Sequence, residues 1–148
     1  MKKEFRAHFL TKVEPAPKAE NEDGRSFDFV CSTSVRDRNG RIVVQDWNLE
    51  EYIANPVVFW NHMIQGDEWS MDSPDVDMTI PIGRASNVRL EDDKLCARIH
   101  FVTVEANPLA EKIYQSVLQK SVNAVSVGWW SDDVTYEMIN EECVAIMR

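Results

Sequence analysis

The chain has 148 residues, 44% of them hydrophobic and 28% charged, which suffices for one domain over residues 1–148 with an apolar core. Its 25 acidic and 16 basic residues give a net charge of −9, which repels nucleic-acid phosphates and anionic membrane surfaces. The sequence has neither an export signal nor the apolar run of about eighteen residues that a membrane span needs. Three cysteines and three histidines lie without metal-ligand spacing, so we expect reduced thiols, no metal and no cofactor.

A strand is predicted early in the chain, after a charged stretch with two prolines that indicates a loop. Its apolar residues recur at every second position and so share one face of a half-buried strand over residues 26–33: Phe27, Phe29 and Cys31. The run Asp37-Arg38-Asn39-Gly40 follows, and it favours a tight hairpin turn because Asn and Gly tolerate positive φ.

The next segment predicts a short helix and then a buried strand. Asn48 is the expected cap of one or two helical turns over residues 48–53, which Asn55-Pro56 ends. The apolar run at 57–60 is typical of a strand buried on both faces, and Asn61-His62 follows at its exit.

Five carboxylates fall between residues 65 and 78, a stretch that has no basic residue. We interpret it as a solvated or substrate-gating loop. The alternative is a divalent-cation site, since carboxylate oxygens bind such ions, although the spacing lacks the order of a calcium loop.

The second half of the chain predicts a hairpin, a helix and further strands. The expected hairpin pairs residues 82–90 with 95–102 across the polar break at 91–94. Apolar residues spaced by four predict the main helix, which Asn107-Pro108 opens, and strands are expected at 122–130, 134–138 and 143–147. The outline is mainly β with one main helix (α+β), a small closed or nearly closed β-barrel.

Two residues stand out as candidates for chemistry. A serine hydroxyl needs a base within hydrogen-bond reach, and His62, at the exit of a strand, suits that role better than His8 or His100, which we interpret as surface or packing residues. Ser126 has Ala124 two residues before it and a glycine two after, which clears space for a substrate backbone. An α/β-hydrolase is disfavoured, because a strand continues after this serine where that fold needs a helix.

Ordered sequence blocks carry a resemblance to a known family. The blocks are Phe29 to Thr33 with Asp37 to Val43, Asn55 to His62, Pro81 to Ala85, and Ala124 to Trp129. Over about residues 26 to 130 they resemble, in the same order, the caudoviral prohead serine proteases of tailed phages.

The resemblance implies a fold like that of the herpesvirus assemblin proteases, with His62 and Ser126 as the catalytic pair. The implied function is a serine endopeptidase that cleaves phage scaffold protein, major capsid protein and itself during prohead maturation. The implied location is the assembling prohead in the cytoplasm of the bacterial host. A homodimer is an implied assembly, whereas no nucleic-acid or membrane partner is expected.

The third catalytic residue and the oxyanion donors stay open at the level of sequence. The chain ends at Arg148 before the family's next strand, so we expect that strand to be lacking and the acid to be Glu141, Glu142 or a residue beyond the end. Backbone N–H groups near Gly128 or the side chain of Arg84 are candidate oxyanion donors. The alternative function is a catalytically inactive, truncated relative that acts as a scaffold or capsid assembly factor.

Overall fold

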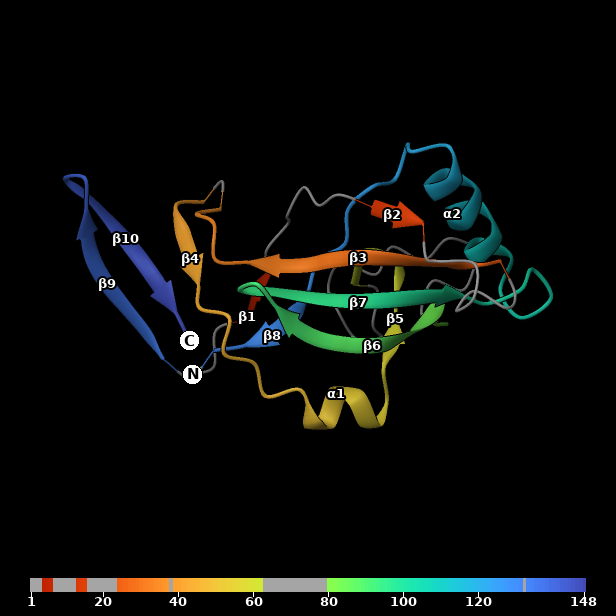
Figure 1. The fold of residues 1–148 in the computed structure, drawn as a ribbon, viewed down its shortest axis with the longest axis horizontal. Helices are drawn as coiled ribbons and strands as arrows, with labels where there is room; N and C mark the ends of the chain where they lie inside the picture. Colours follow the sequence, from red (N-terminus) through yellow and green to blue (C-terminus); the bar gives the residue numbers. More distant parts are fainter. Residues whose placement is uncertain (1–3, 7–12, 16–23, 38, 63–79, 132) are drawn as a thin grey trace.

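Strands make up most of the secondary structure in the computed structural model, which describes residues 4–6, 13–15, 24–37, 39–62, 80–131 and 133–148 (Figure 1). The largest sheet has the order β2 (Val13–Pro15), β3 (Ser26–Thr33), β7 (Lys94–Phe101), β6 (Gly83–Glu91) and β5 (Val57–Val58), all antiparallel. Two α-helices are described: α1 (Glu50–Ala54) and α2 (Pro108–Leu118).

The five-stranded sheet is curled into a half-barrel and remains open. Its strand order has two distinct ends, β2 and β5, so within the described residues the sheet does not return on itself. The expectation of a mainly β, α+β chain is therefore confirmed, whereas the closed barrel is wrong.

Strand β3 has the predicted bounds and the predicted buried face. Phe27, Phe29 and Cys31 are 7%, 3% and 8% exposed and point into the core cluster. The predicted hairpin also forms, because Asp92 and Asp93 adopt the positive φ values of 50° and 58° that a two-residue turn between β6 and β7 requires.

Gly83, at the start of β6, lies against the backbone of β7. A Cβ added there would lie 2.3 Å from the carbonyl oxygen of His100. Such a distance is well inside van der Waals contact, so only glycine allows this close approach of the two strands.

Helix α2 closes one end of the half-barrel (Figure 1). Asn107 caps it by accepting a hydrogen bond from Leu109 N at 2.9 Å, and Pro108 occupies the first turn, where it has no donor to lose. Its buried side chains, Ala110, Ile113 and Val117, belong to the same core cluster as the sheet.

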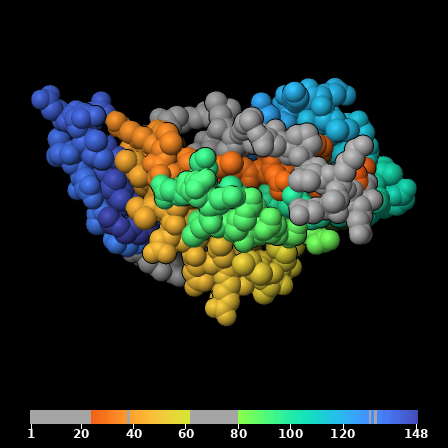
Figure 2. Space-filling model, in the orientation of Figure 1, coloured from red at the N-terminus to blue at the C-terminus, as the bar shows by residue number. Residues whose placement is uncertain are grey.

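A separate three-stranded sheet of order β4-β10-β9 lies at the opposite end from α2 (Figure 1). It comprises β4 (Arg41–Val43), β9 (Val134–Ile139) and β10 (Glu142–Met147), and β4 runs parallel to β10. The turn before β4 forms as predicted, with Gly40 at φ 77°, but it makes no β3–β4 hairpin. Figure 2 shows the β9–β10 region projecting from the body.

Two strand predictions are wrong in extent. β5 comprises Val57 and Val58 alone and is a half-buried end strand of the sheet, not a strand buried on both faces. Of the strand expected at 122–130, only β8 (Gly128–Trp130) pairs, with β1 (Glu4–Arg6). Residues 122–127 form no ladder with any other described residue, since an alternating apolar pattern does not specify a neighbouring strand.

Neither α1 nor α2, the α-helices of the described part of the chain, is long and apolar enough to cross a membrane.

Candidate functional site

The inner face of the half-barrel forms one wall of a cavity of about 1080 Å³. That volume is at the upper end of what small-molecule and peptide sites usually enclose. The wall consists of apolar side chains from β3, β6 and β7, together with Ile113 and Val117 of α2: Phe29, Cys31, Ala85, Val88, Leu95, Ala97, Ile99 and Phe101. The rest of the lining comes from residues 43–44, 46–49, 51–52, 57–61 and 121–129, together with Ile82, Asp133 and Arg148.

Ser126 lies on this cavity, in the segment between α2 and β8. Its neighbours Val125 and Val127 pack against the core cluster, and Ser126 is itself half-buried. The sequence prediction placed Ser126 on a strand. The structure places it on a segment that forms no ladder among the described residues, with both neighbouring valines packed against the core.

Both ends of this segment are held. At its start, Ser116 O accepts hydrogen bonds from Ser121 N at 2.9 Å and Val122 N at 3.2 Å, which turns the chain out of α2. At its end, the ring of Trp129 packs edge-to-face on Trp47 with centroids 5.3 Å apart. We infer that Ser126 sits on a fixed wall of the cavity.

Trp47 is in turn fixed to the body of the protein. Its indole N–H donates to Gln45 Oε1 at 2.9 Å. Gln45, 9% exposed, donates through Nε2 to Ser32 Oγ and to Val43 O, both at 3.0 Å. A buried polar side chain with these partners satisfied is a rigid support.

The segment that ends in His62 reaches the same cavity. β5 leads into a 3-10 turn, Trp60–His62, whose residues Trp60 and Asn61 line the cavity. Asn61 has φ 51° and ψ 31°, the left-handed conformation that Asn tolerates better than most residues. The backbone of His62 is part of this turn, whereas its imidazole lies outside what the structure describes.

The two candidate acids do not lie on the cavity. Glu141 is in the turn between β9 and β10 with φ 66°, and exposed Glu142 forms an ion pair with Arg36 at 2.5 Å. Neither residue is among those that line the cavity with Ser126. The structure therefore does not bring these two glutamates to Ser126.

Three other carboxylates do line the cavity: Asp46, Glu51 and Asp133. Asp133 Oδ2 is 3.9 Å from the guanidinium of Arg148, which lines the cavity too. Sequence reasoning missed them, because no local pattern distinguishes them from the chain's other exposed acids.

One thiol on the cavity is a poor nucleophile. Burial, and after it the neighbouring Cys96 thiol, raise the pKa of Cys31 to about 12, so the thiolate is scarce at neutral pH.

Ser121 also lines the cavity, but it is exposed just after the end of α2, and its hydroxyl donates to Ser116 O at 3.1 Å. Ser126 lines the cavity as a half-buried residue, whereas Ser121 is exposed.

The two candidate oxyanion donors have different positions. Gly128 lines the cavity, two residues from Ser126. Arg84 is exposed and follows Gly83 on β6, on the face that its register partner His100 shares, and it is not among the lining residues. Of these two candidates, Gly128 is therefore the one on the cavity with Ser126.

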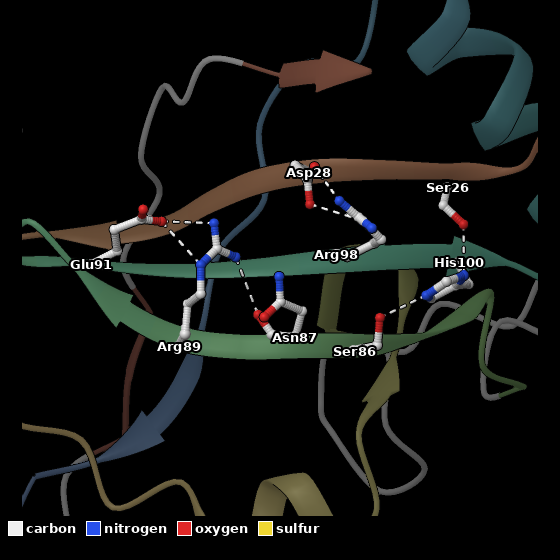
Figure 3. Close-up of polar contacts among 8 residues, drawn as sticks. All are labelled: Ser26, Asp28, Ser86, Asn87, Arg89, Glu91, Arg98 and His100. Atoms are coloured by element: carbon white, nitrogen blue, oxygen red, sulfur yellow. Dashed lines mark hydrogen bonds and ion pairs between the residues drawn. The ribbon is translucent and has the colours of Figure 1, made fainter. Parts of the chain in front are cut away.

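The outer face of the sheet carries a polar network, shown in Figure 3. His100 bridges three strands, with Nδ1 2.6 Å from Ser26 Oγ on β3 and Nε2 2.7 Å from Ser86 Oγ on β6. Beside it, Arg98 donates two hydrogen bonds to Asp28, at 3.0 and 2.8 Å. These contacts agree with the interpretation of His100 as a packing residue.

Within the described residues, no three His, Cys, Asp or Glu side chains cluster in a way that would hold a metal ion. The acidic stretch 65–78, the alternative cation site, lies outside the described residues.

Comparisons with protein-family models, with curated proteins and with solved structures find no match to this chain. The resemblance to prohead proteases therefore rests on the sequence blocks alone.

Proposed function

We propose that the protein is a serine endopeptidase in which Ser126 is the nucleophile and His62 is its general base. One observation carries this proposal. Ser126 and Asn61, which immediately precedes His62, line the same cavity although they lie far apart in the sequence. Hydrolysis by serine needs a hydroxyl and an imidazole within hydrogen-bond reach, and a shared cavity is a first condition for that reach.

In the proposed reaction His62 takes the proton of the Ser126 hydroxyl while Ser126 Oγ attacks the peptide carbonyl carbon. The proton then passes to the amine that leaves as the peptide bond breaks, and an ester to Ser126 forms. Water repeats the sequence in reverse and releases the acid. Backbone N–H groups near Gly128 are the proposed stabilisers of the negative oxygen, and one such donor is typically worth about 3 kcal/mol.

The proposed substrates follow from the resemblance, not from the cavity. They are the scaffold protein and the major capsid protein of a tailed phage, and the chain itself, cleaved inside the assembling prohead in the host cytoplasm. A homodimer is part of the same proposal.

The test is co-expression of the chain with phage scaffold and capsid proteins, followed by intact mass measurement. We expect cleavage by the wild type, and none by Ser126→Ala or His62→Gln. Ser121→Ala is the matched control, because Ser121 lines the same cavity, and it should cleave like the wild type. Cleavage that survives Ser126→Ala would overturn the assignment. A folded wild type that cleaves nothing would favour the inactive assembly factor.

A further inference from the structure

The N-terminal strand β1 occupies one edge of β8. The two strands pair antiparallel, with Glu4 opposite Trp130, Phe5 opposite Trp129 and Arg6 opposite Gly128. In the described part of the chain this is a separate two-stranded sheet. A pair of three-residue strands without further partners is marginally stable.

This edge leads directly to the candidate nucleophile, because β8 begins two residues after Ser126. Residues 122–127, which lead into β8, form no ladder within the described chain. A peptide that pairs with β8 antiparallel and continues in the same direction would therefore pass along Ser126. Recognition of an extended peptide at a strand edge takes its affinity from main-chain hydrogen bonds.

The end strand β5 of the five-stranded sheet is a poorer place for such a peptide. On the end strand β5, the carbonyl of Val57 accepts a hydrogen bond from the Tyr52 hydroxyl at 3.2 Å. The amide of Val57 donates to Asn55 O at 2.9 Å. Because Val57 already has these local partners, a strand that added to β5 would have to break them.

We propose that the edge of β8 occupied by β1 is the binding site for the substrate strand, an extended peptide with apolar side chains, and that β1 must leave before the peptide binds. This inference rests on the proposed function. Apolar side chains fit because Val125, Val127 and Trp129 line the cavity beside the edge. β1 is the strand that moves, since Trp129 anchors β8 on Trp47.

The test locks β1 in place with a disulfide, Glu4→Cys with Trp130→Cys, in a Cys143→Ser background that removes the exposed thiol. Antiparallel partners have Cα atoms about 4.5 to 5.5 Å apart, within the range that a disulfide spans. The oxidised and reduced forms of this one protein are matched controls for each other. Each form is treated with ethyl fluorophosphonate and with acetyl-Val-Val-Leu diphenyl phosphonate.

We expect the lock to slow labelling by the peptidyl probe at least ~10-fold, because only the open fraction binds a strand. Labelling by the small probe should change less than ~2-fold, since it needs no strand edge. Equal peptidyl labelling of both forms would overturn the inference, as would an equal slowing of both probes. If the small probe fails to label even the reduced protein, the proposed function fails instead.

Hydrogen exchange tests the mobility of β1 without any activity. In the wild type, amides of β8 that bond to β1 should exchange at least ~100-fold faster than those in the centre of β7, because a weakly held strand opens locally. The disulfide should slow them. Protection of β8 equal to that of β7 would overturn the proposal that β1 leaves.

Discussion

Ser26 Oγ lies 2.6 Å from Nδ1 of His100 and thereby joins β3 to β7 on the outer face of the sheet (Figure 3). Ser26 is 1% exposed, so its hydroxyl has little access to water as an alternative partner. The second ring nitrogen of His100 reaches Ser86 on β6 at 2.7 Å. One imidazole thus connects the three longest strands.

Ser26→Ala should therefore lower the free energy of unfolding by about 1 kcal/mol, since it removes a hydrogen bond between a buried hydroxyl and the half-buried imidazole of His100. Ser86→Ala should lower it less, because Ser86 is half-buried and water can replace its hydroxyl. Urea denaturation of both variants beside the wild type measures the difference. An unchanged midpoint for Ser26→Ala would show that the bond contributes nothing.

The ion pair between Asp28 and Arg98 predicts a larger effect. Arg98 is 6% exposed, and it donates two hydrogen bonds to the carboxylate of Asp28. Asp28→Asn should destabilise the fold by about 2 kcal/mol, because it leaves a buried guanidinium without its counter-charge. Asp28→Asn combined with Arg98→Met should recover much of that loss.

Glu91→Gln is the matched control for the ion pair. It removes the partner of Arg89, a pair of similar length at 2.7 Å in which both side chains are exposed. Its effect should stay under about 0.5 kcal/mol. Equal losses in Asp28→Asn and Glu91→Gln would contradict the argument from burial.

The cysteines predict how stability depends on alkaline pH. The pKa of Cys31 is raised from 9.0 to about 12 in the folded protein, chiefly by burial, so the native state keeps a proton that the unfolded state releases above pH 9. The stability contributed by this proton is full below pH 9 and is lost as the pH rises towards 12. Between pH 9 and 10 the loss should be about 1 kcal/mol.

Urea unfolding of wild type and Cys31→Ala at pH 8 and at pH 10 measures that loss. The wild type should lose more stability than the variant over this interval, whereas identical losses would contradict the assignment to Cys31.

In the folded protein at pH 8, iodoacetamide should modify Cys143 alone, because Cys31 and Cys96 are buried.

Sequence patterns predicted many of the strands and helices, because these elements depend on interactions between residues close together in the sequence. The apolar alternation in β3, the polar break before β7 and the four-residue spacing in α2 each depend on neighbours in the sequence. The parallel pairing of β4 with β10 could not be predicted in this way, since nothing in Arg41–Val43 specifies a partner at the end of the chain. That the half-barrel is open could not be predicted either, because closure of a barrel depends on which distant strands pair with each other.

The candidate site, too, was predicted from the sequence only where a local pattern marked its residues. Ala124 and Gly128, each two residues from Ser126, indicated a serine with open surroundings, and the structure has Ser126 on a cavity wall. The expectation for Glu141 and Glu142 came from their position near the end of the chain, which says nothing about where the β9–β10 turn lies. The carboxylates on the cavity, Asp46 among them, come from other elements.

Glu141→Gln and Glu142→Gln should therefore leave the rate of fluorophosphonate labelling within ~2-fold of the wild type, because neither residue reaches the cavity. Asp46→Asn and Asp133→Asn are the informative counterparts, since both acids line it. A fall of ~10-fold or more in either glutamate variant would show that an acid of the β9–β10 turn supports the base after all.

The most direct test of the central claim is to count fluorophosphonate adducts on the folded protein by intact mass, in wild type, Ser126→Ala and Ser121→Ala. Fluorophosphonates react with activated serines, and burial of a hydroxyl on a cavity wall is not enough by itself to activate it. We predict one adduct on wild type and on Ser121→Ala, and none on Ser126→Ala. Equal labelling of Ser126→Ala, or no labelling of a folded wild type, would contradict the claim that Ser126 is an activated nucleophile.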